Sequence, residues 1–209
     1  MPKRRANIPG PTVERLCRYH RCLRRVARRG VRRISSADLA ALAGVSPEQV
    51  RKDLSYFGSF GRRGVGYEVE DLVAALEDIL GCKDRRVAII GVGNLGSAIA
   101  GYLANSERGF DIAGLYDNDP ARVGHTVRGM RIRHVNRLAE DNKRQKIDIA
   151  VLCVPESAAQ QAAEHAVAAG IKAILNFAPI TLHLPPKVVV RDADVAADLE
   201  WLSFWLSAH

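Results

Sequence analysis

Apolar residues recur at intervals of three and four between positions 12 and 29, which predicts an amphipathic helix. The repeat runs through Val13, Leu16, Cys17 or His20, Leu23 and Ala27. Gly30 follows and is expected to end the helix. The opposite face is almost wholly arginine, so we expect this helix to pack on one side and to carry positive charge on the other.

A second and a third helix are expected to follow, separated by a glycine. Ser35 or Ser36 caps a short helix, and Gly44 is placed to turn the chain out of it. The apolar residues of this helix are Leu39 and Leu42. The next helix begins with Ser46 as N-cap, Pro47 in the first turn and Gln49 as the capping-box partner. Its apolar face is made by Val50, Leu54 and Phe57.

This order of a short helix, a glycine turn and a second helix predicts a helix-turn-helix, whose second helix would lie in the major groove of DNA. Many helical hairpins share the pattern. Arg51 or Lys52 can donate to O6 and N7 of guanine, and the hydroxyl groups on the same face suit phosphate oxygens. The residues predicted to face DNA here are Ser46, Gln49, Arg51, Lys52, Ser55 and Tyr56.

Residues 58–69 read GSFGRRGVGYEV and predict a β-hairpin wing. Its glycines would let the backbone approach DNA closely, and Arg62 and Arg63, followed by Gly64, would enter a narrow minor groove. A surface hairpin without DNA contact is the alternative. A helix over 70–80 would close a winged-helix DNA-binding domain of residues 1–80, followed by a linker at 81–85.

Positive charge is concentrated in the same part of the chain. The whole chain has a net charge of +8, whereas residues 1–66 hold 16 Lys and Arg against four acidic residues, a net charge of +12. Residues 84–209 are neutral overall. Because phosphate contacts dominate nucleic-acid affinity, this division indicates a polyanion partner for the first part. A merely solvated basic face is the alternative.

Strand, glycine turn and helix follow one another from residue 86, which is typical of a Rossmann-like domain. A β-branched run at 86–90 leads into GVGNLG, and a helical pattern extends over 98–103. Such a turn lets backbone amides and a helix dipole approach a pyrophosphate. The predicted cofactor-binding turn consists of Gly91, Val92, Gly93, Asn94, Leu95 and Gly96.

A second strand at 112–116 would place Asp117 at its carboxyl end, where a carboxylate accepts the ribose hydroxyls and repels a 2′-phosphate. NAD(H) is therefore favoured over NADP(H), although Arg122 is close in sequence. Further strands are expected at 149–154, 173–176 and 188–190, with a helix at 158–169. The loops after these strands would line the nicotinamide end through Val154, Pro155, Asn176, Phe177, Ala178 and Pro179.

Candidates for catalysis are scarce. A dehydrogenase needs a placed proton donor and room for a substrate, but the predicted Rossmann domain fills residues 86–193. We expect His134, His165 and His183 to be surface or loop residues rather than bases. The four cysteines show neither a CxxC pair nor zinc spacing, so they are expected to be small hydrophobes. We predict no catalytic and no metal-binding residues.

The last segment, 194–209, contains both tryptophans and is apolar nearly all round. Such a helix must be buried, either against a second subunit or against its own domain. A symmetric dimer would suit a palindromic operator. The chain has no run of apolar residues long enough for a signal peptide or a membrane span, so we expect a cytoplasmic protein without membrane contact.

Five motifs, VRKDLSYFGSFGRRGVGYEV, GVGNLGSAIAGY, LYDNDP, ILNFAPI and DLEWLSF, closely resemble the Rex family of redox-sensing transcriptional repressors. The resemblance spans essentially the whole chain. It implies an α/β homodimer with an N-terminal winged-helix domain, a Rossmann-like parallel-sheet NAD(H)-binding domain and a swapped C-terminal helix. It also implies binding to inverted-repeat operator DNA when NADH is scarce, release when NADH binds, and NAD⁺ as the weaker competitor.

The same resemblance implies a switch. Arg21 matches the family's arginine that pairs with an aspartate of the partner's C-terminal helix in the DNA-binding form. Asp198 matches that aspartate, with Asp194 one turn away, and Tyr102 matches the tyrosine that captures it when NADH is bound. Two other functions stay open on sequence alone: an NAD-dependent oxidoreductase with a basic appendage, and an architectural nucleic-acid protein that ignores NADH.

Overall fold

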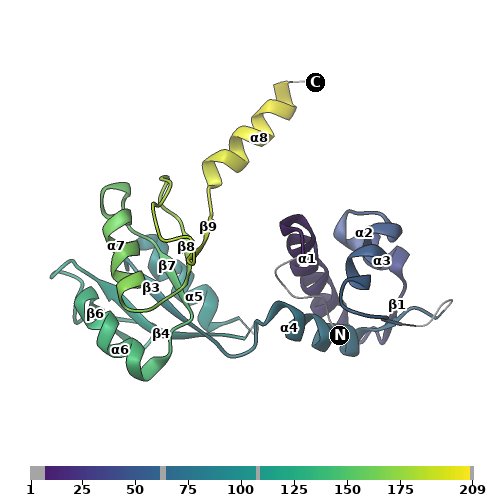
Figure 1. The fold of residues 1–209 in the computed structure, drawn as a ribbon, viewed down its shortest axis with the longest axis horizontal. Coiled ribbons are helices and arrows are strands. Elements are labelled where there is room, and N and C mark those ends of the chain that lie inside the picture. Colours follow the sequence, from purple (N-terminus) through teal and green to yellow (C-terminus); the bar gives the residue numbers. More distant parts are fainter. Residues whose placement is uncertain (1–7, 62–64, 107–108, 208–209) are drawn as a thin grey trace. The chain divides into compact units, whose positions relative to one another are not determined.

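The computed structural model describes residues 8–61, 65–106 and 109–207 (Figure 1). The chain divides into two compact units, Met1–Lys83 and Asp84–His209. The division falls inside the segment 81–85 that the sequence indicates as a linker. Among the described residues, no helix combines the length and apolar character that crossing a membrane requires.

The first unit contains four helices and a two-stranded sheet among its described residues. The helices are α1 (Gly10–Ala27), α2 (Ser36–Ala43), α3 (Pro47–Ser55) and α4 (Val69–Leu80), and the strands are β1 (Arg33–Ile34) and β2 (Tyr67–Glu68). One hydrophobic core joins all four helices. The fully buried side chains at its centre include Leu16, Leu23, Leu39, Leu72 and Leu76.

The caps of α2 and α3 confirm the helix-turn-helix pattern. Ser35 Oγ accepts a hydrogen bond from the amide of Asp38 at 3.0 Å, and Gly44 ends α2 with a positive φ of 65°. Ser46 Oγ accepts from the amide of Gln49 at 3.2 Å. The predicted capping-box role of Gln49 is wrong, because its side-chain amide donates instead to Asp53.

The buried face of α1 differs from the predicted one. Leu16, His20 and Leu23 are buried as expected, but Val13 and Cys17 are exposed. Tyr19, Cys22 and Val26 are buried in their place. The stripe is therefore rotated by about one residue, because α1 packs mainly against α4.

The predicted β-hairpin is wrong in its strand pairing. Residues 58–60 form no strand, and β2 pairs antiparallel with β1, which precedes α2. The segment still folds back on itself, because a Cβ added at Gly61 would lie 2.4 Å from the carbonyl oxygen of Gly66. Arg62, Arg63 and Gly64 lie outside the described residues.

The second unit is built on a seven-stranded sheet with the order β5-β6-β4-β3-β7-β8-β9. All pairs are parallel except the antiparallel pair of β5 and β6. The strands are β3 (Arg85–Ile90), β4 (Phe110–Asp117), β5 (Thr126–Val127), β6 (Met130–His134), β7 (Ile149–Leu152), β8 (Ala173–Asn176) and β9 (Val189–Asp192). Leaving β5 aside, this is the 3-2-1-4-5-6 order of dinucleotide-binding sheets.

Helices cover the two faces of this sheet unequally (Figure 1). The helices α6 (Leu138–Gln145) and α7 (Glu156–Ala168) pack on one face, and α5 (Asn94–Ala104) packs on the other. Several apolar side chains on the α5 face are only partly buried, including Ile112, Ile149, Leu175 and Phe177. Helix α6, a short 3-10 helix at Val135–Arg137 and strands β5 and β6 lie in a stretch for which the sequence predicted no element.

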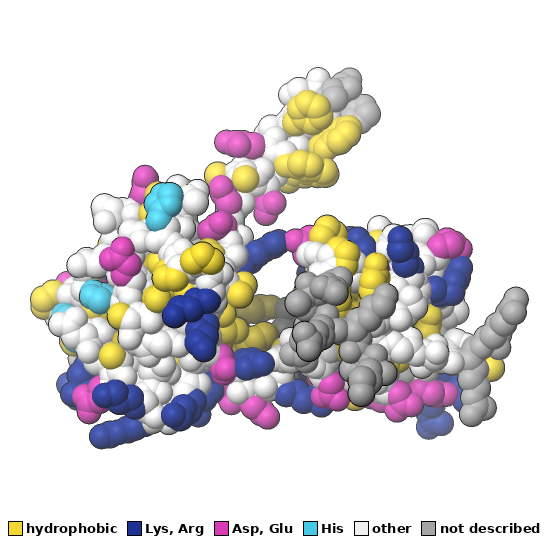
Figure 2. Space-filling model, viewed as in Figure 1, with side chains coloured by type: hydrophobic (Ala, Val, Ile, Leu, Met, Phe, Trp, Pro, Cys, Tyr) yellow, Lys and Arg dark blue, Asp and Glu magenta, His cyan; other side chains and the backbone are white. Residues whose placement is uncertain are grey.

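The C-terminal helix α8 (Val195–Ser207) is exposed on every side. Its large apolar side chains, Leu199, Trp201, Leu202, Phe204, Trp205 and Leu206, are between 49% and 80% exposed. Figure 2 shows these hydrophobic side chains gathered along the helix. Packing of α8 against its own domain, one of the two predicted alternatives, is therefore not what the chain adopts.

Candidate nucleotide and nucleic-acid sites

The turn between β3 and α5 can be built only from glycine at two of its positions. Gly91 has a φ of +88°, and a Cβ there would lie 2.5 Å from the carbonyl oxygen of Cys153. A Cβ at Gly96 would lie 2.0 Å from the carbonyl oxygen of Gly91. Gly93 differs, because a Cβ there would meet only the end of the Arg122 side chain. The glycines thus leave the backbone of the turn open to a pyrophosphate, apart from the guanidinium of Arg122, which lies over Gly93.

Asp117 lies where the sequence predicts, at the carboxyl end of β4 beside the glycine turn. Its Oδ2 accepts a hydrogen bond from the amide of Val92 at 2.7 Å, and its Oδ1 accepts from the amide of Asp119 at 3.0 Å. The side chain is nearly buried, at 7% exposure. The two backbone amides thus fix the orientation of the Asp117 carboxylate beside the glycine turn.

A cleft of about 380 Å³ opens between the glycine turn and the ends of β4, β6 and β7. Asp117, Val154 and Pro155 share its wall with Arg122, His134 and His165. The full lining is Ile90, Gly91, Asp117, Asn118, Asp119, Arg122, His134, Val135, Asn136, Cys153, Val154, Pro155, Ala158, Gln161, Ala162 and His165. Val154 and Pro155 therefore line the same cleft as Asp117.

His134 and His165 line this cleft, which sequence reasoning missed. His134 Nδ1 accepts from the amide of Asn136 at 3.2 Å. The position of His134 could have been found from the strand at 130–134, whose carboxyl end lies beside Asp117 in the parallel sheet. The sequence expectation of a surface or loop position holds for His183, which is exposed in a loop, whereas His134 ends β6 and His165 lies on α7, and both are half-buried.

The loop after β8 is organised by Asn176. This buried side chain donates through Nδ2 to the carbonyl oxygens of Ala178 and Ile180 and to Asp192, and its Oδ1 accepts from the amide of Ala178. The donor–acceptor distances of these hydrogen bonds are between 2.9 and 3.1 Å. Asn176 thus shapes the loop, in which Ala178 is buried, Phe177 and Ile180 are half-buried and Pro179 is exposed.

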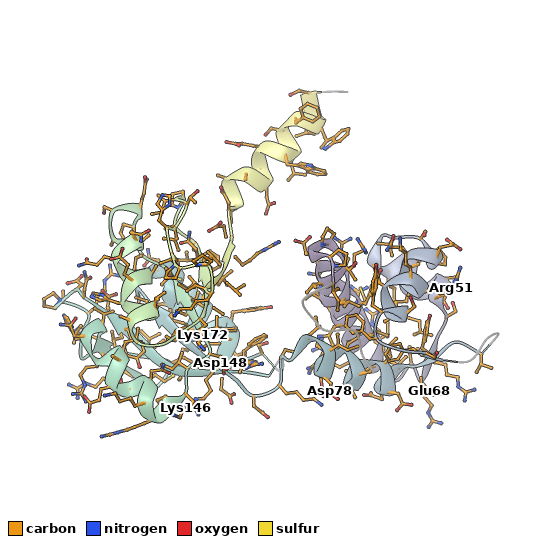
Figure 3. All side chains as sticks on the ribbon, viewed as in Figure 1. Arg51, Glu68, Asp78, Lys146, Asp148 and Lys172 are labelled. Carbon is orange, nitrogen blue, oxygen red and sulfur yellow. The ribbon has the colours of Figure 1, made fainter. Side chains whose placement is uncertain are left out.

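The predicted DNA-facing side of α3 is exposed. The exposed residues of the predicted set are Ser46, Arg51, Lys52 and Ser55, whereas Gln49 and Tyr56 are half-buried. Figure 3 labels Arg51 on this helix. Its Nη1 donates to Ser36 Oγ at 2.8 Å and its Nη2 to Glu48 at 2.6 Å, while Ser55 Oγ donates to the carbonyl oxygen of Lys52. The guanidinium is therefore held at the junction of α2 and α3.

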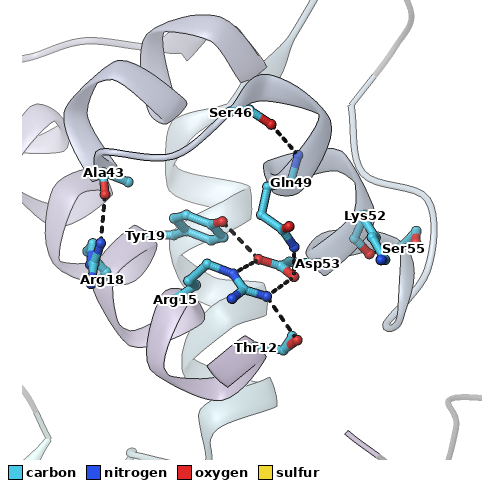
Figure 4. A network of polar contacts seen from close by, with 10 residues as sticks. All are labelled: Thr12, Arg15, Arg18, Tyr19, Ala43, Ser46, Gln49, Lys52, Asp53 and Ser55. Atoms are coloured by element: carbon cyan, nitrogen blue, oxygen red, sulfur yellow. Dashed lines mark hydrogen bonds and ion pairs between the residues drawn. The ribbon is translucent and has the colours of Figure 1, made fainter. Parts of the chain in front are cut away.

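The opposite side of α3 holds a buried acid that sequence reasoning missed. Asp53 is fully buried and accepts hydrogen bonds from Arg15, Tyr19 and Gln49 (Figure 4). Burial by itself would raise the pKa of this carboxyl, but the three donors outweigh it and lower the pKa. Burial and the contact with Asp53 raise the pKa of Tyr19. An ionised Asp53 thus joins α1 to α3.

The three residues of the implied switch are all exposed. Arg21 is on α1 in the first unit, whereas Tyr102 on α5 and Asp198 on α8 belong to the second unit. Tyr102 is 58% exposed. Asp194 caps α8, since its Oδ1 accepts from the amide of Ala197 at 3.0 Å. A capping role suits Asp194, and it leaves Asp198 as the carboxylate free of a capping bond.

Family models match both units. Residues 7–55 match a model described as "Putative DNA-binding protein N-terminus", and residues 82–180 match one described as "CoA binding domain". Curated relatives span the whole chain. The redox-sensing transcriptional repressor Rex of Desulfitobacterium hafniense is 48% identical over 198 residues, covering 94% of each chain. The repressor of the same name from Streptomyces coelicolor is 44% identical, covering 96% of this chain and 78% of its own.

Solved structures agree with the sequence relatives. A structure of RSP with β-NAD⁺ and operator DNA superposes with a TM-score of 0.88 at 40% identity, covering 96% of this chain and 93% of its own. A structure of RSP with β-NADH superposes with a TM-score of 0.85 at 38% identity, covering 97% of this chain and 95% of its own. RSP is described as a Rex-family repressor.

The fold and its two sites define a transcriptional regulator in which a helix-turn-helix unit is joined to a dinucleotide-binding unit. The relatives are named as repressors and not as enzymes. The chain belongs to the Rex family of redox-sensing transcriptional repressors. The sequence prediction of family and fold class is confirmed, and a regulator is favoured over the oxidoreductase.

Proposed function

We propose that this chain binds operator DNA when NADH is scarce and releases it when NADH binds, acting in the cytoplasm without catalysing a reaction. One observation carries the proposal: a basic helix-turn-helix and a cleft with a glycine turn and an oriented acid belong to one chain. RSP, which shares this fold, has been solved both with NAD⁺ on operator DNA and with NADH. The function is therefore a response to the NADH/NAD⁺ ratio.

The residues that would hold the dinucleotide follow from the geometry of the second unit. The amides at the start of α5 would donate to the pyrophosphate, and Asp117 would accept from the adenosine ribose. NADH carries an uncharged nicotinamide ring, whereas NAD⁺ carries a cation. Phe177, Ala178 and Pro179 would surround that ring with apolar groups, which favours the uncharged form. No proton or hydride needs to move.

The residues that would hold DNA belong to α3 and the segment after it. Arg51 and Lys52 would reach base edges, and Ser46, Ser55 and Tyr56 would contact phosphates, with Arg62, Arg63 and Gly64 near the minor groove. If NADH weakens DNA binding, DNA must weaken NADH binding by the same coupling free energy, typically about 1 to 3 kcal/mol, because linkage is reciprocal.

In a homodimer, the exposed apolar side chains of α8 would be buried. The helix buries none of its described side chains, and the α5 face of the sheet has half-buried apolar residues that a second chain could cover. Exchange of residues 194–209 between two chains would bury both surfaces and place two copies of α3 on an inverted repeat. In such a dimer, cofactor binding would be coupled to the DNA-binding units through Arg21, Tyr102 and Asp198.

The test is operator binding by fluorescence anisotropy at fixed salt, titrated with NADH and separately with NAD⁺. Release by NADH at much lower concentration than by NAD⁺ is expected. Binding that neither nucleotide changes would point to an architectural protein and would refute the proposal. Turnover of the cofactor with a small alcohol or acid would instead support the oxidoreductase.

A further inference from the structure

The polar network around Asp53 connects a buried carboxylate to a residue at the DNA-facing start of α3. Arg15 donates through Nε and Nη2 to the two carboxylate oxygens, at 2.6 and 2.8 Å. Tyr19 donates from its hydroxyl to Oδ2 at 2.9 Å, and Gln49 donates from Nε2 to Oδ1 at 2.8 Å (Figure 4). Two donors come from α1 and one comes from the first turn of α3 itself.

This arrangement decides which way round the Gln49 amide lies. An ionised carboxylate only accepts hydrogen bonds, so a side-chain amide beside it must present its NH₂ group and turn its carbonyl oxygen elsewhere. Reversing the amide would set Oε1 against Oδ1 of Asp53, two acceptors at hydrogen-bond distance. Among the described residues, none donates to Oε1 of Gln49, which is therefore open to a donor from outside the chain.

We propose that Asp53 is a positioning residue for operator recognition, which locks Gln49 so that its carbonyl oxygen reads the DNA. The proposal rests on the proposed function, operator binding through α3. Residues at the start of a recognition helix are those that contact base edges. In the major groove, the donors that a carbonyl oxygen can meet are the exocyclic amino groups of adenine and cytosine.

The hydrogen bond to Asp53 gives Gln49 a base preference that a glutamine side chain does not have by itself. A free glutamine amide can turn over and accept or donate, so it tolerates either an amino base or a keto base. A locked amide favours adenine or cytosine at the contacted position, because guanine and thymine present O6 or O4 to an acceptor. Asp53 thereby contributes to sequence specificity without touching DNA.

The chain offers matched controls for this idea. Asp141 in the second unit accepts from the Tyr116 hydroxyl at 3.1 Å and from Arg133 at 2.8 Å, the same chemistry away from α3. Tyr19→Phe removes one donor from Asp53 but leaves the carboxylate facing Gln49. Neither Asp141→Asn nor Tyr19→Phe should therefore change a base preference, even if each lowers stability.

The experiment uses the full-length protein and DNA duplexes selected by the wild type from a random library. Each position of the selected half-site is then changed to all four bases, and binding is measured for every variant protein. Asp53→Asn should relax the preference for an amino base at one position by about tenfold or more. Gln49→Ala should relax it at the same position. The two controls should keep the wild-type pattern.

Two results would overturn the inference. Asp53→Asn could weaken the binding of all duplexes equally, which would mean that the network only stabilises the position of α3. Alternatively, it could relax the base preference at a position other than the one affected by Gln49→Ala. If Asp53→Asn does not fold, Gln49→Ala carries the test: a Gln49→Ala protein that keeps the wild-type preference for an amino base would refute the acceptor role. A wild type that selects no duplex would instead refute the proposed function.

Discussion

The guanidinium of Arg122 lies beside the carboxylate of Asp117, with Nη1 3.7 Å from Oδ2, at the mouth of the cofactor cleft. The same guanidinium reaches Asp119 Oδ2 through Nε at 3.3 Å. A carboxylate in this place rejects a 2′-phosphate, whereas an arginine near it accommodates one. In this chain the guanidinium of Arg122 lines the cleft but is paired with the carboxylates of Asp117 and Asp119.

We therefore predict that Asp117→Asn weakens NADH binding and narrows the preference for NADH over NADPH. Loss of a charged acceptor should cost about 1.5 to 3 kcal/mol, and the released Arg122 should attract the extra phosphate. Fluorescence titrations with both nucleotides measure the two affinities. The double variant Asp117→Asn with Arg122→Ala is the control, and NADPH binding that is equally strong in single and double variants would contradict this role of Arg122.

The glycine turn predicts opposite outcomes for two similar substitutions. Gly93→Ala should fold normally, because its Cβ meets only the flexible end of Arg122, but it should place a methyl group where the pyrophosphate binds. DNA binding should then persist while NADH no longer releases it. Gly96→Ala should destabilise the second unit by about 3 kcal/mol or more, because its Cβ would overlap a backbone oxygen. Thermal unfolding and anisotropy together separate the two effects.

Operator binding through α3 predicts a specific loss when the exposed side chain of Arg51 is removed. Arg51→Ala should weaken operator binding by about 1 to 3 kcal/mol and relax specificity at one base pair. NADH affinity should stay unchanged, since Arg51 lies in the other unit. Binding measured at several salt concentrations distinguishes base contact from phosphate contact, because a lost phosphate contact lowers the salt dependence by about one unit of slope. A parallel loss of NADH affinity would contradict two separate sites.

What the sequence could predict was set by local chemistry. The caps Ser35, Gly44 and Ser46 and the turn GVGNLG each depend on neighbours within a few residues, and the structure confirms these turns. Asp53 could not be placed, because its burial depends on Arg15, 38 positions away. The pairing of β2 with β1 was missed for the same reason. Helix α6 is short and mostly polar, so its periodicity is weak.

The lowered pKa of Asp53 predicts a loss of stability in acid. A carboxyl whose pKa is lower in the folded than in the unfolded state stabilises the protein above the unfolded pKa, about 3.9, and this contribution disappears as the pH falls toward the folded pKa. Hydrogen exchange of α1 and α3 should therefore show falling protection, corrected for intrinsic rates, between pH 5 and more acidic conditions. In the Asp53→Asn variant, the free energy of opening measured by hydrogen exchange at pH 7 should be lower by about 3 kcal/mol. This variant should also lack the pH dependence.

The exposed apolar surface of α8 predicts that residues 194–209 hold two chains together. Deleting them should convert a homodimer into a monomer, because both this helix and the half-buried α5 face of the sheet would lose their partner. Light scattering after size-exclusion chromatography measures the mass. Glu200→Gln, which changes only a polar group of the same helix, should leave the dimer intact. The truncated chain should still bind one half-site, but it should lose the gain in affinity that a dimer obtains on an inverted repeat. A truncated protein that remains dimeric would place the interface elsewhere and leave the apolar surface of α8 without a role in dimerisation.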